Sequence, residues 1–105
     1  MNLPNLPRPR AAERVVAAPA GELDLATADE LKAVLAGETS AGGQVVLDLS
    51  PVTFMDATAL GVIVGAANQL ARKGGRLTLT GATPPIERVL HLTGLHTMLV
   101  ALPTR

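Results

Sequence analysis

The feature that most constrains this chain is a strand, a connection and a helix in direct succession over residues 45–75. The apolar run over residues 45–49 is typical of a strand that is covered on both faces. A Pro-containing loop is expected over residues 50–55. Apolar residues then recur at spacings of three and four, which predicts a helix that begins near Asp56 or Ala57 and ends at the glycine pair 74–75.

The segment before this unit predicts two short strands and one helix. Residues 14–18 read as an edge strand, because Pro19 interrupts it and cannot donate to a ladder. Residues 20–25 form a second extended piece, which we expect to pair antiparallel with the first. Thr27 and Glu30 have the spacing of a capping box, which predicts a helix start. That helix is expected to end at Gly37, with a loop over residues 38–43.

The segment after the unit predicts a strand over residues 76–80, a helix closed by Gly94 and a last strand over residues 98–102. Strands that alternate with helices favour right-handed crossovers and a parallel sheet. The predicted fold class is therefore α/β: one domain with a mixed, mostly parallel β-sheet and helices mainly on one face.

Composition limits the core and the domain count. The chain has 105 residues, which suits one domain, and 48% of them are apolar although a single Phe is the only aromatic residue. The core is therefore expected to be aliphatic. Residues 1–10 contain three prolines and no apolar periodicity, so we predict a flexible tail there and a domain over residues 11–105.

Several function classes lack support in the sequence. The formal net charge is zero, so no basic balance recruits nucleic acid. The chain has no cysteine, and its two histidines do not stand at metal-ligand spacing. No catalytic nucleophile motif or phosphate-binding loop is present. No apolar run reaches the ~20 residues of a membrane span. We expect a cytoplasmic, non-enzymatic protein without cofactor or metal.

Two motifs resemble those of a known family. The sequence FMDATALG, preceded by LDLS and followed by an apolar helix, is similar to the signature of the STAS domain, the sulphate transporter and anti-sigma factor antagonist family. The run GELD over residues 21–24, which leads into a helix at Thr27, resembles the family's other marker. The resemblance covers residues 15–102 and implies a STAS-like fold.

Thr58 is the candidate switch residue. In its plain structural role it is a threonine in the first turn of a helix, held by a bond to the backbone. The resemblance instead implies that Thr58 is a phosphoacceptor. Asp56 is either the N-cap of the helix or a contact for a partner kinase. Asp48, at the end of its strand, is expected to accept hydrogen bonds from loop amides.

The resemblance implies an anti-sigma factor antagonist, which binds an anti-sigma factor serine/threonine kinase while unphosphorylated and so releases a sigma factor. Phosphorylation at Thr58 would switch binding off and a phosphatase would reset it. The expected partner-binding residues surround that position: Asp24, Met55, Asp56, Ala57, Thr58, Leu60 and Gly61. The alternative is a structural STAS subunit of a lipid-transport or stress-sensing assembly, without a phospho-switch. A homo-oligomer is compatible with either function.

Two departures from the family pattern concern the neighbours of Thr58. Ala57 stands where a second hydroxyl residue is common, so the modified residue is unambiguous. Ala59 replaces a frequent Gly, and its methyl group is expected to narrow a kinase's access to Thr58. Gly61 and Gly65 are expected to let the helix lie close on the sheet. A response-regulator receiver is not supported, because the first strand carries no acidic pair and no Lys follows Lys73.

Overall fold

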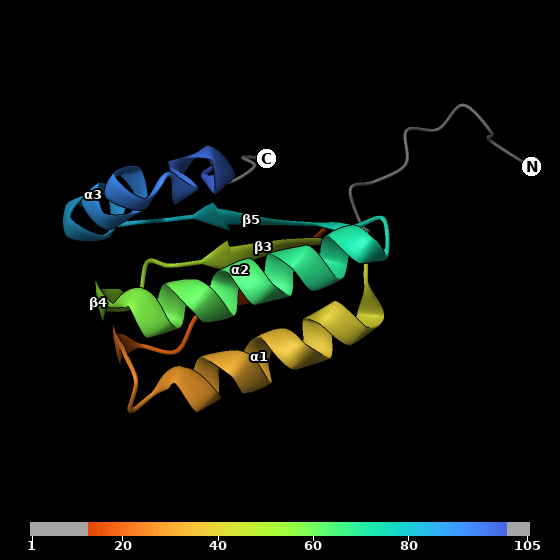
Figure 1. Cartoon of the computed structure of the whole chain (residues 1–105), viewed down its shortest axis with the longest axis horizontal. Coiled ribbons are helices and arrows are strands. Elements are labelled where there is room, and N and C mark those ends of the chain that lie inside the picture. The colour runs from red at the N-terminus through yellow and green to blue at the C-terminus, as the bar shows by residue number, and fades with distance from the viewer. Residues whose placement is uncertain (1–12, 101–105) are drawn as a thin grey trace, which may run out of the picture.

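The computed structural model of this chain describes residues 13–100. Figure 1 shows how the helices and strands of these residues are arranged. In chain order they are β1 (Glu13–Ala17), β2 (Gly21–Leu23), α1 (Ala28–Ala41), β3 (Gln44–Asp48), β4 (Val52–Met55), α2 (Ala57–Arg72), β5 (Arg76–Thr80), α3 (Pro84–Thr93) and the 3-10 helix η2 (Leu95–Met98). The tail predicted over residues 1–10 lies outside the described residues.

The described strands pair in parallel throughout. β1, β3 and β5 form a three-stranded sheet in that spatial order, and Val16, Leu47 and Leu79 lie side by side across it. β2 and β4 form a separate two-stranded ladder. The predicted α/β class with a mostly parallel sheet is confirmed. The antiparallel pairing expected between residues 14–18 and 20–25 is wrong.

A proline after each of two neighbouring strands explains this topology. Pro19 follows β1 and Pro51 follows β3, and neither residue has a backbone N–H to continue a ladder. After each proline the chain continues in the direction of the preceding strand. The amide of Gly21 donates to the carbonyl of Pro51 at 2.9 Å. β2 therefore lies beside β4 and does not turn back on β1. For the same reason residues 52–55, expected as loop, form a strand.

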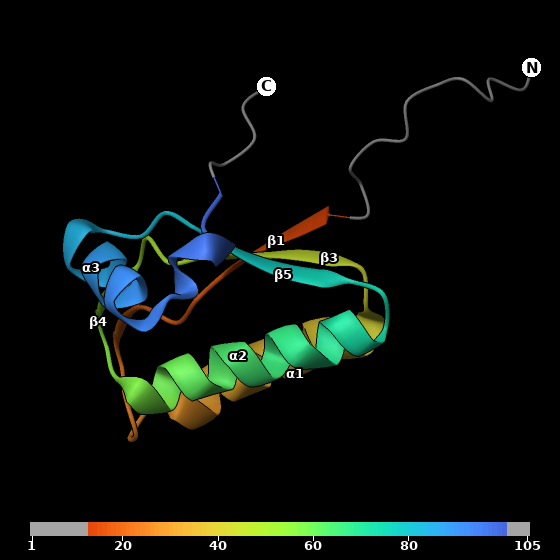
Figure 2. The ribbon, with the colours of Figure 1, turned by 45° about the horizontal axis from the view of Figure 1, so that its top comes forward.

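The helices cover one face of the three-stranded sheet. Figure 2 shows α1 and α2 side by side below the sheet, with α3 at the end where β4 lies. Leu47 of β3, Leu35 of α1 and Ile63 of α2 belong to one buried apolar cluster. The largest fully buried side chains are aliphatic, as predicted, and the single aromatic residue, Phe54, is 50% exposed.

α1 is longer than its sequence predicts. It continues through Gly37 to Ala41 and ends at Gly42, whose φ of 74° is left-handed. Two cations from other elements bind the last carbonyls of the helix: Arg14 donates to the carbonyl of Glu38 at 3.1 Å, and Lys73 donates to that of Thr39 at 3.0 Å. These tertiary contacts offset the poor helix propensity of Gly37. The predicted helix end at Gly37 and loop over 38–43 are therefore wrong.

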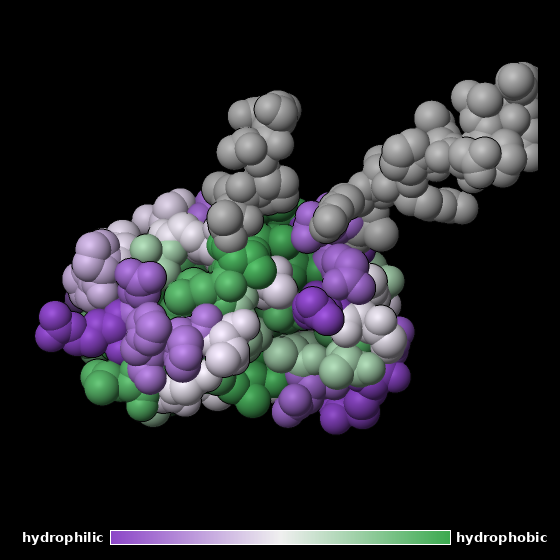
Figure 3. All heavy atoms as spheres, turned by 90° about the horizontal axis from the view of Figure 1, so that it is seen from above, coloured by the Kyte–Doolittle hydropathy of each residue, from purple (hydrophilic) through white to green (hydrophobic). Residues whose placement is uncertain are grey.

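The end of the described chain packs beside β5. Gly94 closes α3 in the left-handed conformation, as predicted. The next residues form η2, and Leu99 then makes an isolated parallel bridge to Leu79 of β5. The strand predicted over residues 98–102 is thus reduced to a bridge at Leu99, and residues 101–102 lie outside the described range. Figure 3 shows one face of the molecule, on which apolar surface gathers near the middle between hydrophilic margins.

Candidate functional site around Thr58

The ends of β2 and β4 meet the start of α2 at one end of the molecule, and Asp56 joins them. Its Oδ1 accepts a hydrogen bond from the amide of Ala59 at 3.1 Å and thereby caps α2, as predicted. Its Oδ2 accepts from the amide of Leu25 at 3.3 Å, and its own amide donates to the carbonyl of Leu23 at 3.0 Å. One residue therefore fixes the start of α2 against the turn that follows β2.

That turn is organised by Asp24. Its Oδ1 accepts from the amides of Ala26 at 3.0 Å and Thr27 at 3.1 Å, which makes Asp24 a turn aspartate. The Thr27 hydroxyl accepts from the Asp24 amide and donates to the carbonyl of Glu22 at 2.7 Å. Because the hydroxyl is engaged with the turn, it does not cap α1. The predicted capping box between Thr27 and Glu30 is wrong.

Thr58 lies in the first turn of α2 with an exposed side chain. Since the cap of this helix is supplied by Asp56, the Thr58 side chain is not required for it. Its neighbours Ala57 and Gly61 are exposed as well. These three residues form a small, accessible surface at the start of α2.

The other predicted partner-binding residues are less accessible. Asp24 and Asp56 are half-buried beside this surface. Met55 and Leu60 are only 3% and 8% exposed and belong to the core cluster. Their side chains pack into the core beneath the exposed residues of the site. The same holds for Ala59, which is completely buried. Its methyl group points into the core, so the expected narrowing of access to Thr58 is wrong.

Two apolar residues at this end of the molecule were missed by the sequence analysis. Leu25 is 77% exposed, and its amide is bonded to Asp56. Phe54 is 50% exposed in β4, two residues before Asp56. In β4 the end residues Val52 and Met55 are buried, whereas Thr53 and Phe54 between them are exposed. The one available signal was the position of the only aromatic residue in the chain.

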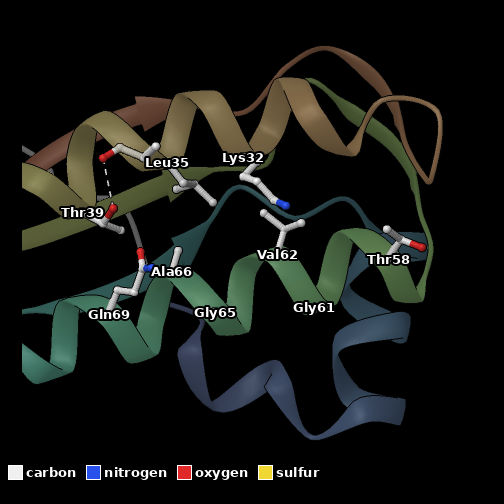
Figure 4. Close-up of a pocket in the computed structure, with 10 residues that line it drawn as sticks. Lys32, Leu35, Thr39, Thr58, Gly61, Val62, Gly65, Ala66 and Gln69 are labelled. Atoms are coloured by element: carbon white, nitrogen blue, oxygen red, sulfur yellow. Dashed lines mark hydrogen bonds between the residues drawn. The ribbon is translucent and has the colours of Figure 1, made fainter.

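A groove runs from Thr58 along the seam between α1 and α2 (Figure 4). Its volume is about 580 Å³. The residues that line it come from both helices: Lys32, Leu35, Ala36 and Thr39 from α1, and Thr58, Gly61, Val62, Gly65, Ala66 and Gln69 from α2. Gly61 and Gly65 are exposed, and a Cβ atom at either would have no neighbour within 4 Å. The prediction that these glycines bring the helix close to the sheet is wrong, because they line the groove.

Over residues 13–100, no group of three or more His, Cys, Asp or Glu side chains is placed to hold a metal ion. In the same range no helix is both long and apolar enough to cross a membrane.

The sequence model of the STAS domain matches residues 6–105 of this chain. The chain belongs to the STAS domain family. The anti-sigma-B factor antagonist of Listeria monocytogenes is 39% identical to this STAS domain over 77 residues, which are 72% of this chain and 68% of the relative. The family membership implied by the two sequence motifs is thereby confirmed.

Solved structures resemble this STAS domain in fold. The anti-sigma factor antagonist SpoIIAA in its unphosphorylated form superposes with a TM-score of 0.73 at 22% identity, over 88% of this chain and 82% of that one. An anti-sigma factor antagonist from Mycobacterium paratuberculosis superposes with a TM-score of 0.71 at 28% identity, over 86% of this chain and 76% of that one. The STAS domain therefore has the fold that its sequence predicted.

Proposed function

We propose that this STAS domain is an anti-sigma factor antagonist. In its unphosphorylated form it binds an anti-sigma factor that is also a serine/threonine kinase, and so releases a sigma factor. That partner phosphorylates Thr58, which ends binding, and a phosphatase restores the active form. The observation that carries the proposal is the exposed side chain of Thr58 in the first turn of α2, within the family signature. The name of the Listeria monocytogenes relative supports the same function.

Local physics favours a switch that leaves the fold intact. A phosphate adds about −1.5 to −2 charges. At Thr58 that charge lies near the positive end of the α2 dipole, so the helix tolerates it. The core residues below, Met55 and Leu60, do not have to move to admit the group, because the side chain it modifies is already at the surface.

The same charge would lower the affinity of a partner that binds over Thr58. Phosphate on Thr58 would stand beside the Asp56 carboxylate, which is held in place by two backbone amides. A partner surface over this point would bury an unpaired dianion, which typically costs about 2–5 kcal/mol, or about 30-fold to several-thousand-fold in affinity. The exposed Leu25 and Phe54 offer apolar contact area to a partner at the same end of the molecule.

The test is incubation of the purified domain with its cognate anti-sigma factor and ATP, followed by intact-mass measurement. We expect a gain of one phosphate in the parent and none in Thr58→Ala, and we expect the modified protein to lose binding in a pull-down. A parent that binds the partner but gains no phosphate would overturn the switch. It would favour the alternative function, a structural STAS subunit in which Thr58 is only a contact residue.

A further inference from the structure

We propose that Lys32 binds the phosphate carried by modified Thr58, across the groove between α1 and α2. This inference rests on the proposed function, since it concerns the phosphorylated form. Lys32 would thus be a positioning residue of the switch, supplied by a helix that precedes the signature motif in the sequence.

The geometry of the groove brings the two residues to the same hollow. Thr58 and Lys32 both line it, from α2 and α1 respectively. Figure 4 shows the Lys32 side chain reaching over α2 at Val62, which lies one helical turn beyond Thr58. Gly61 stands in the intervening turn and leaves open space where a Cβ would be. No side chain therefore stands on α2 between Lys32 and Thr58 at position 61. Figure 4 shows the Thr58 hydroxyl pointing away from Lys32, so the pairing requires the Thr58 side chain to rotate towards the groove.

The charges favour the pairing. Lys32 is the only charged residue among those that line the groove. Within residues 13–100, the structure contains a single ion pair, between Arg14 and Glu38, so Lys32 is not engaged with a described carboxylate. A group of nearly two negative charges on Thr58 would attract this flexible cation. The amides at the start of α2 compete for the phosphate, and the experiment below separates the two contributions.

The pairing has a consequence for binding. It would place a charged bridge over the groove, from α1 to the first turn of α2. The modified domain would then no longer present an open hollow beside Thr58. Phosphorylation would act on a partner both through added charge and through closure of this hollow.

The experiment measures the second pKa of the phosphate by ³¹P NMR titration, with phosphothreonine installed at position 58 during translation. An adjacent cation favours the dianion and lowers this pKa below its ordinary value of about 6. We expect Lys32→Gln to raise it by about 0.3–0.7 units relative to the parent, the range that an exposed pair supports. Lys32→Arg should keep the low value, and added salt should reduce the difference.

Arg72→Gln is the matched control. Arg72 is an exposed cation in the last turn of α2, the helix that begins beside Thr58. Its loss changes the net charge by the same amount as the loss of Lys32 but removes no cation near Thr58. We expect this variant to titrate as the parent does. Equal pKa values for the parent and Lys32→Gln would overturn the proposal and assign the phosphate to the amides of α2 alone. Because no kinase is used, this result is independent of whether a partner phosphorylates Thr58 in the cell.

Discussion

The carboxylate of Asp56 accepts a hydrogen bond from the backbone amide of Leu25, 31 residues earlier in the chain, at 3.3 Å. Its other oxygen caps α2 through Ala59. The residue two positions before Thr58 thus holds the helix that carries Thr58 and the turn that carries Asp24. Neither bond can be deduced from the signature motif alone, because the motif does not contain the turn.

Asp56→Ala should destabilise the domain. The variant removes a helix cap, which typically costs about 1–2 kcal/mol, and leaves the amide of Leu25 without its partner. For a domain of this size we expect a fall in Tm of about 4–8 °C for each kcal/mol, measured by thermal denaturation. Asp56→Asn is the control, because its single carbonyl oxygen can restore the cap at Ala59 but not the bond from Leu25, and it should therefore recover part of the loss. If the alanine variant melts with the parent, the cap does not stabilise the fold.

Thr58→Glu should weaken binding to the anti-sigma factor without unfolding the domain. Glutamate places one negative charge where phosphate places about two, so we expect Kd to rise at least about tenfold by calorimetry. Its stability should stay within about 0.5 kcal/mol of the parent, since the position is exposed and the helix dipole favours an acid there. Thr58→Ala should bind as the parent does and resist inactivation by ATP. Parent-like affinity of the glutamate variant would contradict the switch.

Gly65→Ala and Gly75→Ala should change stability in opposite directions. Gly65 lies inside α2 on the groove, where a Cβ meets nothing within 4 Å, so alanine should stabilise the helix by about 0.5–1 kcal/mol. At Gly75 a Cβ would clash with the backbone carbonyl of Gly43, so that variant should lose about 1–3 kcal/mol. Urea denaturation measures both. Destabilisation by Gly65→Ala would mean that this helix face is packed against the protein.

Arg14→Ala should shorten α1. The Arg14 side chain pairs with the Glu38 carboxylate at 2.7 Å and donates to the carbonyls of Glu38 and Gly42. The guanidinium group is partly exposed, so we expect a loss of about 1–2 kcal/mol, with faster amide exchange confined to the last turn of α1. Lys32→Ala, on the same helix but away from its end, should leave those amides protected. Unchanged exchange in the Arg14 variant would show that Gly42 and Lys73 hold the end of the helix without Arg14.

The sequence predicted the helices, the parallel sheet and the position of Thr58 because these depend on local periodicity and a motif. The position of Gly37 inside α1, and not at its end, was not predictable in this way. It depends on Arg14 and Lys73, which reach the end of α1 from other elements. The pairing of β2 with β4 likewise depends on two prolines far apart in the sequence, Pro19 after β1 and Pro51 after β3.

In the candidate site, too, the roles set by local sequence were predictable and those set by tertiary structure were not. Asp56 and Asp24 act as a cap and a turn residue, as their positions suggest. The sequence could not distinguish the exposed Ala57 from the buried Leu60, since that requires the rotation of α2 about its axis. For the same reason the sequence analysis wrongly predicted that Gly61 and Gly65 face the sheet. The groove and Lys32 were missed for this reason.

β2 and β4 pair outside the three-stranded sheet, yet Leu23, Val52 and Met55 belong to the same buried cluster as the rest of the core. Opening this ladder would therefore expose core side chains to water. Under the proposed function, a partner at Asp24 and Thr58 would thus meet a backbone that is anchored to the aliphatic interior, so its fit depends on side chains already in place.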